Sequence, residues 1–251
     1  MITQDSIRQL ANQYHTSEHP NIVREYFQHL FLSELYKISD AEHLLFKGGT
    51  ALRILYGSPR FSEDLDFSLF SVPERERTRL VESLFEKVLV SVERSGIAVT
   101  YGPKPGPTRE GYFGSASFVL FDYPPVEIEI NVSERNGRTV EGEVNTIASL
   151  FVPTYNIFHL PQIDLVHEKV FGALLGRKKE RDFYDLYFLL RKNMLSGEQK
   201  KKLAPYAQEI IAEAELRDFA LELGVFLPAD QQSIVKSFAA TLKGEIDRQL
   251  S

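Results

Sequence analysis

The 251-residue sequence contains no cysteine, and this absence excludes several kinds of site at once. A chain without thiols has no disulfides, no thiolate zinc site and no cysteine nucleophile. Such a composition fits a reducing compartment.

The sequence also lacks the long apolar runs and the basic excess that mark two other classes of protein. No run approaches the roughly 20 apolar residues needed to span a bilayer, and the N-terminal MITQDSIRQL lacks the basic start and apolar core of a signal peptide. A formal net charge of −6 disfavours a protein that coats nucleic acid. We therefore expect a cytoplasmic protein with no membrane segment.

What the chain does have is a hydrophobic content of 43%, enough for one sizeable core or for a main lobe and a smaller one. The first residues read as two helices, and the end of the chain reads as helical and rich in lysine and glutamate. We expect a first lobe at residues 1–157 and a helical C-terminal lobe at residues 158–251.

The most informative stretch is KGGTALRILYGSPRFSEDLDFSL, residues 47–69. Gly48 and Gly49 have no side chain, so the backbone there can approach a phosphate closely. Thr50 is typical of an N-cap, and residues 51–56 favour a helix. Such a helix would direct its free N–H groups and its positive dipole end at an anion beside the glycines.

Alternation of polar and apolar residues from Arg60 to Leu69 predicts a strand directly after this helix. Residues two apart on a strand project from one face, about 6.6 Å apart along the chain. Asp64 and Asp66 can therefore converge on one ion. A D-x-D pattern alone is frequent by chance, but two glycines and a helix upstream make the signal much stronger.

The stretch resembles the first motif of the nucleotidyltransferase superfamily that includes DNA polymerase beta, and within it the AbiEii/AbiGii group of toxin-type enzymes. The residues that carry the resemblance are Gly48-Gly49-Thr50, Leu52-Arg53, Gly57, Arg60, Ser62, Asp64 and Asp66-Phe67. The resemblance implies an α+β fold: a polymerase beta-like lobe with a small mixed sheet flanked by helices, plus a C-terminal helical lobe.

The superfamily takes a third metal-binding carboxylate from a strand beside the D-x-D strand. In the predicted strand at residues 126–132, Glu127, Glu129 and Asn131 share one face. We expect Glu129 to be the third carboxylate, with Glu127 as the alternate because sequence does not fix the register. An acidic strand face directed at water is the other interpretation.

A second segment that resembles the AbiEii group contains Glu168-Lys169, Arg177 and Arg181-Asp182-Phe183-Tyr184-Asp185-Leu186. The resemblance implies a catalytic or nucleotide-contacting Lys169 and a catalytic Asp182. The spacing alone fits an intrahelical ion-pair network equally well, since Asp182 and Asp185 are three apart and Arg177 and Arg181 four apart.

Nucleotidyl transfer needs charge neutralisation and alignment, because the nucleoside triphosphate (NTP) carries its own leaving group. The oxygen ligands of Asp64, Asp66 and Glu129 would select Mg²⁺ or Mn²⁺. Two such ions about 3.5–4 Å apart lower the charge barrier at the attacking and departing oxygens.

The remaining candidates are residues that would contact the triphosphate. We expect backbone amides of Gly48, Gly49 and Thr50 to hold it and Ser62 to donate to its terminal phosphate. Further candidate phosphate ligands are Arg53, Arg60, Lys169 and Arg181. Either of the first two arginines could instead pair with a structural carboxylate.

These residues predict a metal-dependent enzyme that moves a nucleoside monophosphate from an NTP to an acceptor hydroxyl and releases pyrophosphate. The resemblance implies an RNA acceptor, the 3′ end of tRNA, and a toxin with a cognate antitoxin as partner. Three alternatives stay open: a kinase-like phosphotransferase, a glycosyltransferase that uses the D-x-D to hold a UDP-sugar, and an inactive nucleotide-binding protein.

Overall fold

The computed structural model describes residues 2–102, 105–108, 111–134 and 141–250, and the chain divides into two compact units. Unit 1 comprises Met1–Gly57 and Phe61–Leu160. Unit 2 comprises Pro161–Ser251 together with the short segment Ser58–Arg60. The chain therefore enters unit 2 twice.

Unit 1 is built on a mixed sheet, in which the described residues form eight strands. The strands are β1 (Leu44–Lys47), β2 (Leu65–Leu69), β3 (Ala98–Tyr101), β4 (Gly106–Thr108), β5 (Gly111–Val119), β6 (Val126–Ser133), β7 (Glu143–Ile147) and β8 (Tyr155–His159). Their order is β3-β5-β6-β2-β1-β8-β7, and β4 pairs with β5. β2 runs antiparallel to β1 and parallel to β6, so it lies at the centre of the sheet. Residue 158, where we predicted the lobe boundary, lies inside β8.

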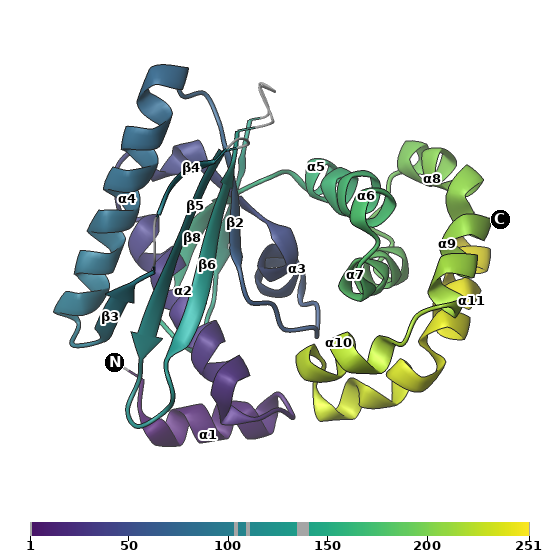
Figure 1. Cartoon of the computed structure of the whole chain (residues 1–251), viewed down its shortest axis with the longest axis horizontal. Coiled ribbons are helices and arrows are strands. Elements are labelled where there is room, and N and C mark those ends of the chain that lie inside the picture. Colours follow the sequence, from purple (N-terminus) through teal and green to yellow (C-terminus); the bar gives the residue numbers. More distant parts are fainter. Residues whose placement is uncertain (1, 103–104, 109–110, 135–140, 251) are drawn as a thin grey trace. The chain divides into compact units, whose positions relative to one another are not determined.

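The helical elements of unit 1 cover both faces of this sheet. They are α1 (Gln4–Gln13), η1 (Glu18–Ile22), α2 (Val23–Leu35), η2 (Ala41–His43), α3 (Gly48–Tyr56) and α4 (Glu74–Arg94). α2 and α4 lie on one face, and α3 lies on the other (Figure 1). The short helix α3 thus has one face of the central strands to itself among the helices of this unit that the structure describes.

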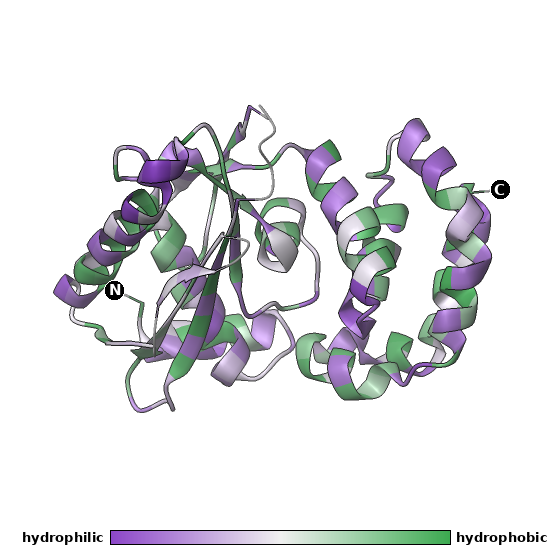
Figure 2. Cartoon of the chain, turned by 45° about the horizontal axis from the view of Figure 1, so that its top comes forward, coloured by the Kyte–Doolittle hydropathy of each residue, from purple (hydrophilic) through white to green (hydrophobic). Residues whose placement is uncertain are grey.

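The core of unit 1 lies between the sheet and the pair α2 and α4. The alternation in β6 buries its apolar residues Val126, Ile128, Ile130 and Val132. Phe85 of α4 packs against Phe31 of α2 at 5.9 Å and against Phe67 of β2 at 6.4 Å between ring centroids. Figure 2 shows the matching division of α4 into hydrophobic and hydrophilic stripes, as expected for a helix with one buried face.

The described part of unit 2 is helical. Its elements are α5 (Gln162–His167), η3 (Glu168–Leu174), α6 (Leu175–Arg177), α7 (Glu180–Arg191), α8 (Gly197–Leu203), η4 (Ala204–Tyr206), α9 (Ala207–Glu215), α10 (Phe219–Phe226), η5 (Ala229–Ser237) and α11 (Phe238–Leu250). Residues 182–190 of α7 are all buried, so this helix is the centre of the unit. Phe238 of α11 packs on Tyr184 of α7 and on Phe219 of α10, with ring centroids 5.8 and 4.6 Å away.

The mixed sheet flanked by helices and the helical C-terminal region confirm the predicted α+β fold class. No helix among the described residues combines the length and the apolar character needed to cross a bilayer.

Candidate active site

Gly48, the first residue of α3, lies directly against Asp66 in the middle of β2. Gly48 has a φ of +83°, and a Cβ at this position would lie 2.0 Å from Oδ2 of Asp66 and 2.8 Å from its Cβ. Only glycine is compatible with this φ and this contact together. The Asp66 carboxylate therefore lies against bare backbone at the N-terminus of α3.

The helix itself begins three residues earlier than the sequence predicted, at Gly48 instead of residue 51. Its N-cap is Lys47, in extended conformation, and Thr50 is inside the first turn rather than at the cap. The prediction of Thr50 as the N-cap was wrong, because the positive φ of Gly48 turns the chain directly from β1 into the helix. Binding of a triphosphate by the amides of Gly48, Gly49 and Thr50 stays a prediction.

The register of the central strands aligns three polar residues. Asp66 is the Cα partner of Lys47 on β1 and of Asn131 on β6, so the three side chains project from the same face of the sheet. Glu129 lies two residues before Asn131 on β6, and Glu127 lies four residues before it. Of the two glutamates, Glu129 therefore lies nearer to the position of Asp66 along the strands. The sequence placed Asn131 on this face but gave no sign that it lies opposite Asp66.

Asp64 precedes β2 instead of lying within it, because the predicted strand over residues 60–69 forms only from residue 65. Side chains, rather than a neighbouring strand, hold this loop. The Thr50 hydroxyl donates to the carbonyl of Asp64 at 2.5 Å. Gln28 Nε2 donates to the carbonyls of Ser62 at 2.9 Å and Glu63 at 3.1 Å. Three consecutive carbonyls are therefore fixed, and with them the backbone from which Asp64 projects.

Arg53 forms an ion pair inside unit 1. Its Nε and Nη2 donate to the two carboxylate oxygens of Glu25 at 2.8 and 2.7 Å, and both side chains are buried. The guanidinium also lies 3.7 Å from the ring centroid of Phe61. Burial raises the pKa of Glu25, and the charge of Arg53 offsets part of that increase. This pairing with a structural carboxylate is the alternative that the sequence left open for Arg53.

Arg60 belongs to unit 2 and pairs there with Asp185 of α7. Arg60 Nε and Nη2 donate to Oδ1 of Asp185 at 3.0 and 2.9 Å. Lys169 Nζ donates to Oδ2 at 2.8 Å. Burial tends to raise the pKa of Asp185, but the charges of Arg60 and Lys169 outweigh it and hold that pKa below its usual value. We call Arg60, Lys169 and Asp185 the Asp185 cluster.

Lys169 lies in η3, a π-helical stretch, and its side chain is 11% exposed. π-Helical turns are rare and frequently occur at functional sites. Asp185, at 1% exposure, was not among the predicted site residues. The Arg-Asp-x-x-Asp pattern contained it, but sequence alone could not reveal which of the two aspartates holds the lysine.

Asp182, the other aspartate, organises the start of α7. Its carboxylate accepts from Nε and Nη2 of Arg177 at 2.9 and 2.7 Å and from the backbone N–H of Lys179 at 3.0 Å. Arg181 lies 3.4 Å from Glu222 of α10. Opposite charges therefore pair around the start of α7. The catalytic role of Asp182 stays a prediction.

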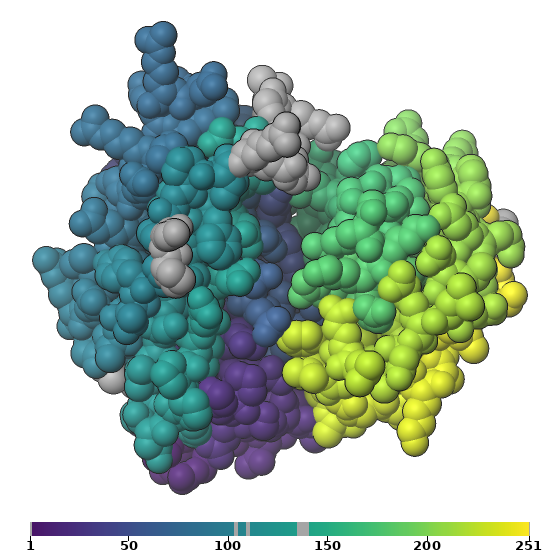
Figure 3. All heavy atoms as spheres, viewed as in Figure 1, coloured from purple at the N-terminus to yellow at the C-terminus, as the bar shows by residue number. Residues whose placement is uncertain are grey.

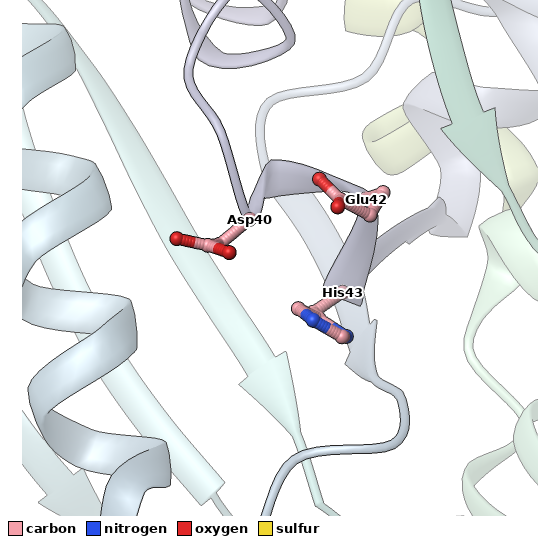
Figure 4. Close-up of side chains that lie close together, drawn as sticks. All are labelled: Asp40, Glu42 and His43. Carbon is pink, nitrogen blue, oxygen red and sulfur yellow. The ribbon is translucent and has the colours of Figure 1, made fainter.

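One further group of side chains in unit 1 has metal-ligand chemistry. Ligand atoms of Asp40, Glu42 and His43 lie within 4.8 Å of one another around the short turn η2 (Figure 4). His43 Nδ1 lies 3.0 Å from the carbonyl oxygen of Phe70. The group is at the opposite end of β1 from Gly48. Both carboxylates are exposed, and exposed acidic groups are common without an ion, so the group by itself supports no function.

Comparisons with known proteins agree with the sequence resemblance. The family described as "Nucleotidyl transferase AbiEii toxin, Type IV TA system" matches residues 30–247 and confirms the predicted family. No curated protein matches the chain.

Two similar solved structures come from Helicobacter pylori. One is described as a candidate nucleotidyltransferase and has a TM-score of 0.61 and 17% identity, over 92% of this chain and 95% of that one. The other, JHP933, has a TM-score of 0.57 and 17% identity over the same shares. At this level of identity the two structures support the fold.

Proposed function

Because this chain is a nucleotidyltransferase of the AbiEii toxin family, we propose that it transfers a nucleoside monophosphate from an NTP to a hydroxyl at the 3′ end of tRNA. The acceptor hydroxyl loses its proton to solvent and its oxygen bonds to the α-phosphorus. The bond from that phosphorus to the oxygen bridging it to the β-phosphate breaks, and pyrophosphate leaves. A cognate antitoxin that counteracts the enzyme is part of the proposal, as is a cytoplasmic place of action, where NTPs and tRNA occur together.

The observation that carries the proposal is the contact of the Asp66 carboxylate with the bare backbone of Gly48. The N-terminus of α3 has N–H groups with no partner inside the helix and a positive dipole end, which suit the phosphates of an NTP. A carboxylate at the same place would repel those phosphates. A divalent cation held by this carboxylate would offset the repulsion, because it would attract both groups.

The residues around Asp66 are chemically suited to such a cation. Carboxylate oxygens of Asp64, Asp66 and Glu129 are hard ligands of the kind that Mg²⁺ and Mn²⁺ prefer, and the Asn131 side chain adds an amide oxygen on the sheet face of Asp66 and Glu129. When bound, the ion neutralises charge on the triphosphate and on the departing pyrophosphate. The hydrogen bonds to the carbonyls of residues 62–64 fix the backbone that carries the Asp64 carboxylate. No reorganisation of this backbone is then needed during the reaction.

Unit 2 contains the second segment that resembles the AbiEii group. We propose Lys169 as a catalytic or nucleotide-contacting residue and Asp185 as a positioning residue that holds its ammonium with a hydrogen bond of 2.8 Å. Asp182 holds Arg177 in the same way, with two hydrogen bonds. The assignment of Lys169 rests on its family-like position and on this pre-organised contact.

The test is to incubate the purified protein with Mg²⁺, total cellular RNA and each of the four α-labelled NTPs. We expect label in a tRNA band and release of pyrophosphate from the wild type. Asp64→Ala and Asp66→Ala should each lose transfer, whereas Asp5→Ala, which changes an exposed aspartate of α1, should retain it. Near-normal transfer by both site variants would refute the mechanism. Release of nucleoside diphosphate instead of pyrophosphate would indicate a kinase.

A further inference from the structure

A cavity of about 430 Å³ opens between α4 and the outer strands of the sheet in unit 1, away from Gly48 and Asp66. This volume is within the range of sites that bind small molecules, about 300–1,000 Å³. Its lining residues include Glu82, Phe85, Glu86, Leu89, Tyr112 and Ile130. None of them belongs to the candidate active site.

The floor of the cavity is apolar and buried. Phe85, Leu89 and Ile130 are between 2% and 6% exposed. Gly114 has no side chain, so the backbone of β5 is bare at this point. A Cβ built there would have Tyr112 at 3.5 Å and Pro105 at 3.8 Å as its nearest neighbours. These are ordinary contacts, so an alanine would fit, and a longer side chain would enter the cavity.

The rim of the cavity is negative. Glu82 and Glu86 stand one helical turn apart on α4, and no lysine, arginine or histidine is among the lining residues that the structure describes. Burial and then the charge of Glu82 raise the pKa of Tyr112. Burial, followed by the charges of Glu93 and Glu86, raises that of Tyr101. Figure 3 shows side chains of the blue segment that includes α4 projecting from the surface beside the teal strands.

We propose that this cavity binds an organic cation, an ammonium or guanidinium group on an apolar stem. The stem would lie on Phe85, Leu89 and Ile130, where its burial is favourable. The cation would lie near two tyrosine rings and two carboxylates, which attract positive charge. An anion of the same shape would face the carboxylates of Glu82 and Glu86, which repel it. This site is independent of nucleotidyl transfer.

Three probes with the same six-carbon stem test the charge preference: hexylammonium, hexanol and hexanoate. Binding to the full chain at pH 7 and low salt is followed by isothermal titration calorimetry. Cation–π and ion-pair contacts both favour the ammonium group, so we expect hexylammonium to bind about tenfold more tightly than hexanol. Hexanoate should bind most weakly. Equal affinity for hexylammonium and hexanoate would overturn the proposal.

Variants test the place of binding. The double variant Glu82→Gln, Glu86→Gln should weaken hexylammonium binding about tenfold and leave hexanol unchanged. Its control is Glu76→Gln, in the first turn of α4 and outside the cavity. Gly114→Leu should block all probes and Gly114→Ala should not, provided that thermal melting shows both folded. Unchanged hexylammonium binding in the glutamine double variant would refute the assignment even if Gly114→Leu fails to fold.

A last pair of probes separates two sources of the same chemistry. Spermidine represents a free polyamine, and an acetylated, amidated Leu-Lys-Leu peptide represents a lysine side chain of a partner protein. The probe that binds more tightly and loses affinity in the glutamine double variant identifies the source. Loss of affinity in neither probe would contradict the proposal.

Discussion

Replacing Gly48 with alanine tests how far the site depends on the position of one carboxylate. The added Cβ would lie 2.0 Å from Oδ2 of Asp66, and contacts of a real Cβ essentially never fall below 3.0 Å. The oxygen must therefore move by at least 1 Å (3.0 − 2.0). Rotation of the side chain cannot relieve the overlap fully, since the Cβ of Asp66, fixed to β2, would also be too close at 2.8 Å.

A matched control is available in the same helix, because Gly57 ends α3 with a φ of +73°. A Cβ at Gly57 would have nothing within 4 Å. Both alanine variants carry the cost of a left-handed backbone, about 1–2 kcal/mol, and only Gly48→Ala carries the clash. In a chain of this size we expect each kcal/mol to lower the melting temperature by about 2–4 °C.

The assay is the initial rate of nucleoside monophosphate transfer at saturating NTP, with thermal melting of both variants. A displacement of about 1 Å at a reacting centre costs on the order of 10²-fold in rate, and we expect that loss for Gly48→Ala. Gly57→Ala should stay near the wild-type rate. A folded Gly48→Ala protein with wild-type activity would show that the Asp66 carboxylate need not lie against α3.

Three further predictions follow from the same structure. Glu129→Gln should reduce transfer on the order of 10²-fold and Glu127→Gln should not; the reverse order of rates would move the third carboxylate to Glu127. Asp185→Asn should lower the free energy of unfolding by about 3–5 kcal/mol in urea titration, because Arg60 and Lys169 lose the buried carboxylate that pairs with both; an unchanged midpoint would contradict this. Burial, aided by the charge of Arg53, lowers the pKa of His29 from 6.5 to about 3, so its contribution to stability is complete above pH 6.5 and falls as the pH drops towards 3. His29→Gln should therefore flatten the melting temperature between pH 4 and pH 6.5, and an unaltered slope would count against it.

The local features of the motif could be predicted from sequence because their cause is local. The glycine pair, the helix after it and the alternation in β2 and β6 each depend on residues within about ten positions. The long helix α4, Glu74–Arg94, has a local cause of the same kind, because its buried apolar residues recur at helical spacing.

The partners of the charged residues could not be predicted, because they are distant in sequence. Glu25 is 28 residues from Arg53, and Asp185 is 125 residues from Arg60. Sequence spacing indicates which charges share a helix face, and neither pair lies on one helix. The register that aligns Asp66 with Asn131 is likewise a property of two strands.

The start of β2 was predicted too early for a related reason. Alternation continues back to Arg60, but the carbonyls of residues 62–64 are taken by Gln28 and Thr50. A hydrogen bond from a helix side chain to a loop carbonyl does not change the pattern of polar and apolar residues in that loop. Sequence periodicity therefore cannot distinguish such a loop from a strand.

The three-residue excursion of the chain at Ser58–Arg60 into unit 2 bears on any dissection of this protein. A fragment that begins at Pro161 would lack Arg60. The carboxylate of Asp185, which is 1% exposed, would then have only Lys169 as its counter-charge. Neither half is thus a self-sufficient module: a single cut leaves one member of a buried pair on the wrong piece. Truncation studies should preserve residues 58–60 or replace Asp185 at the same time.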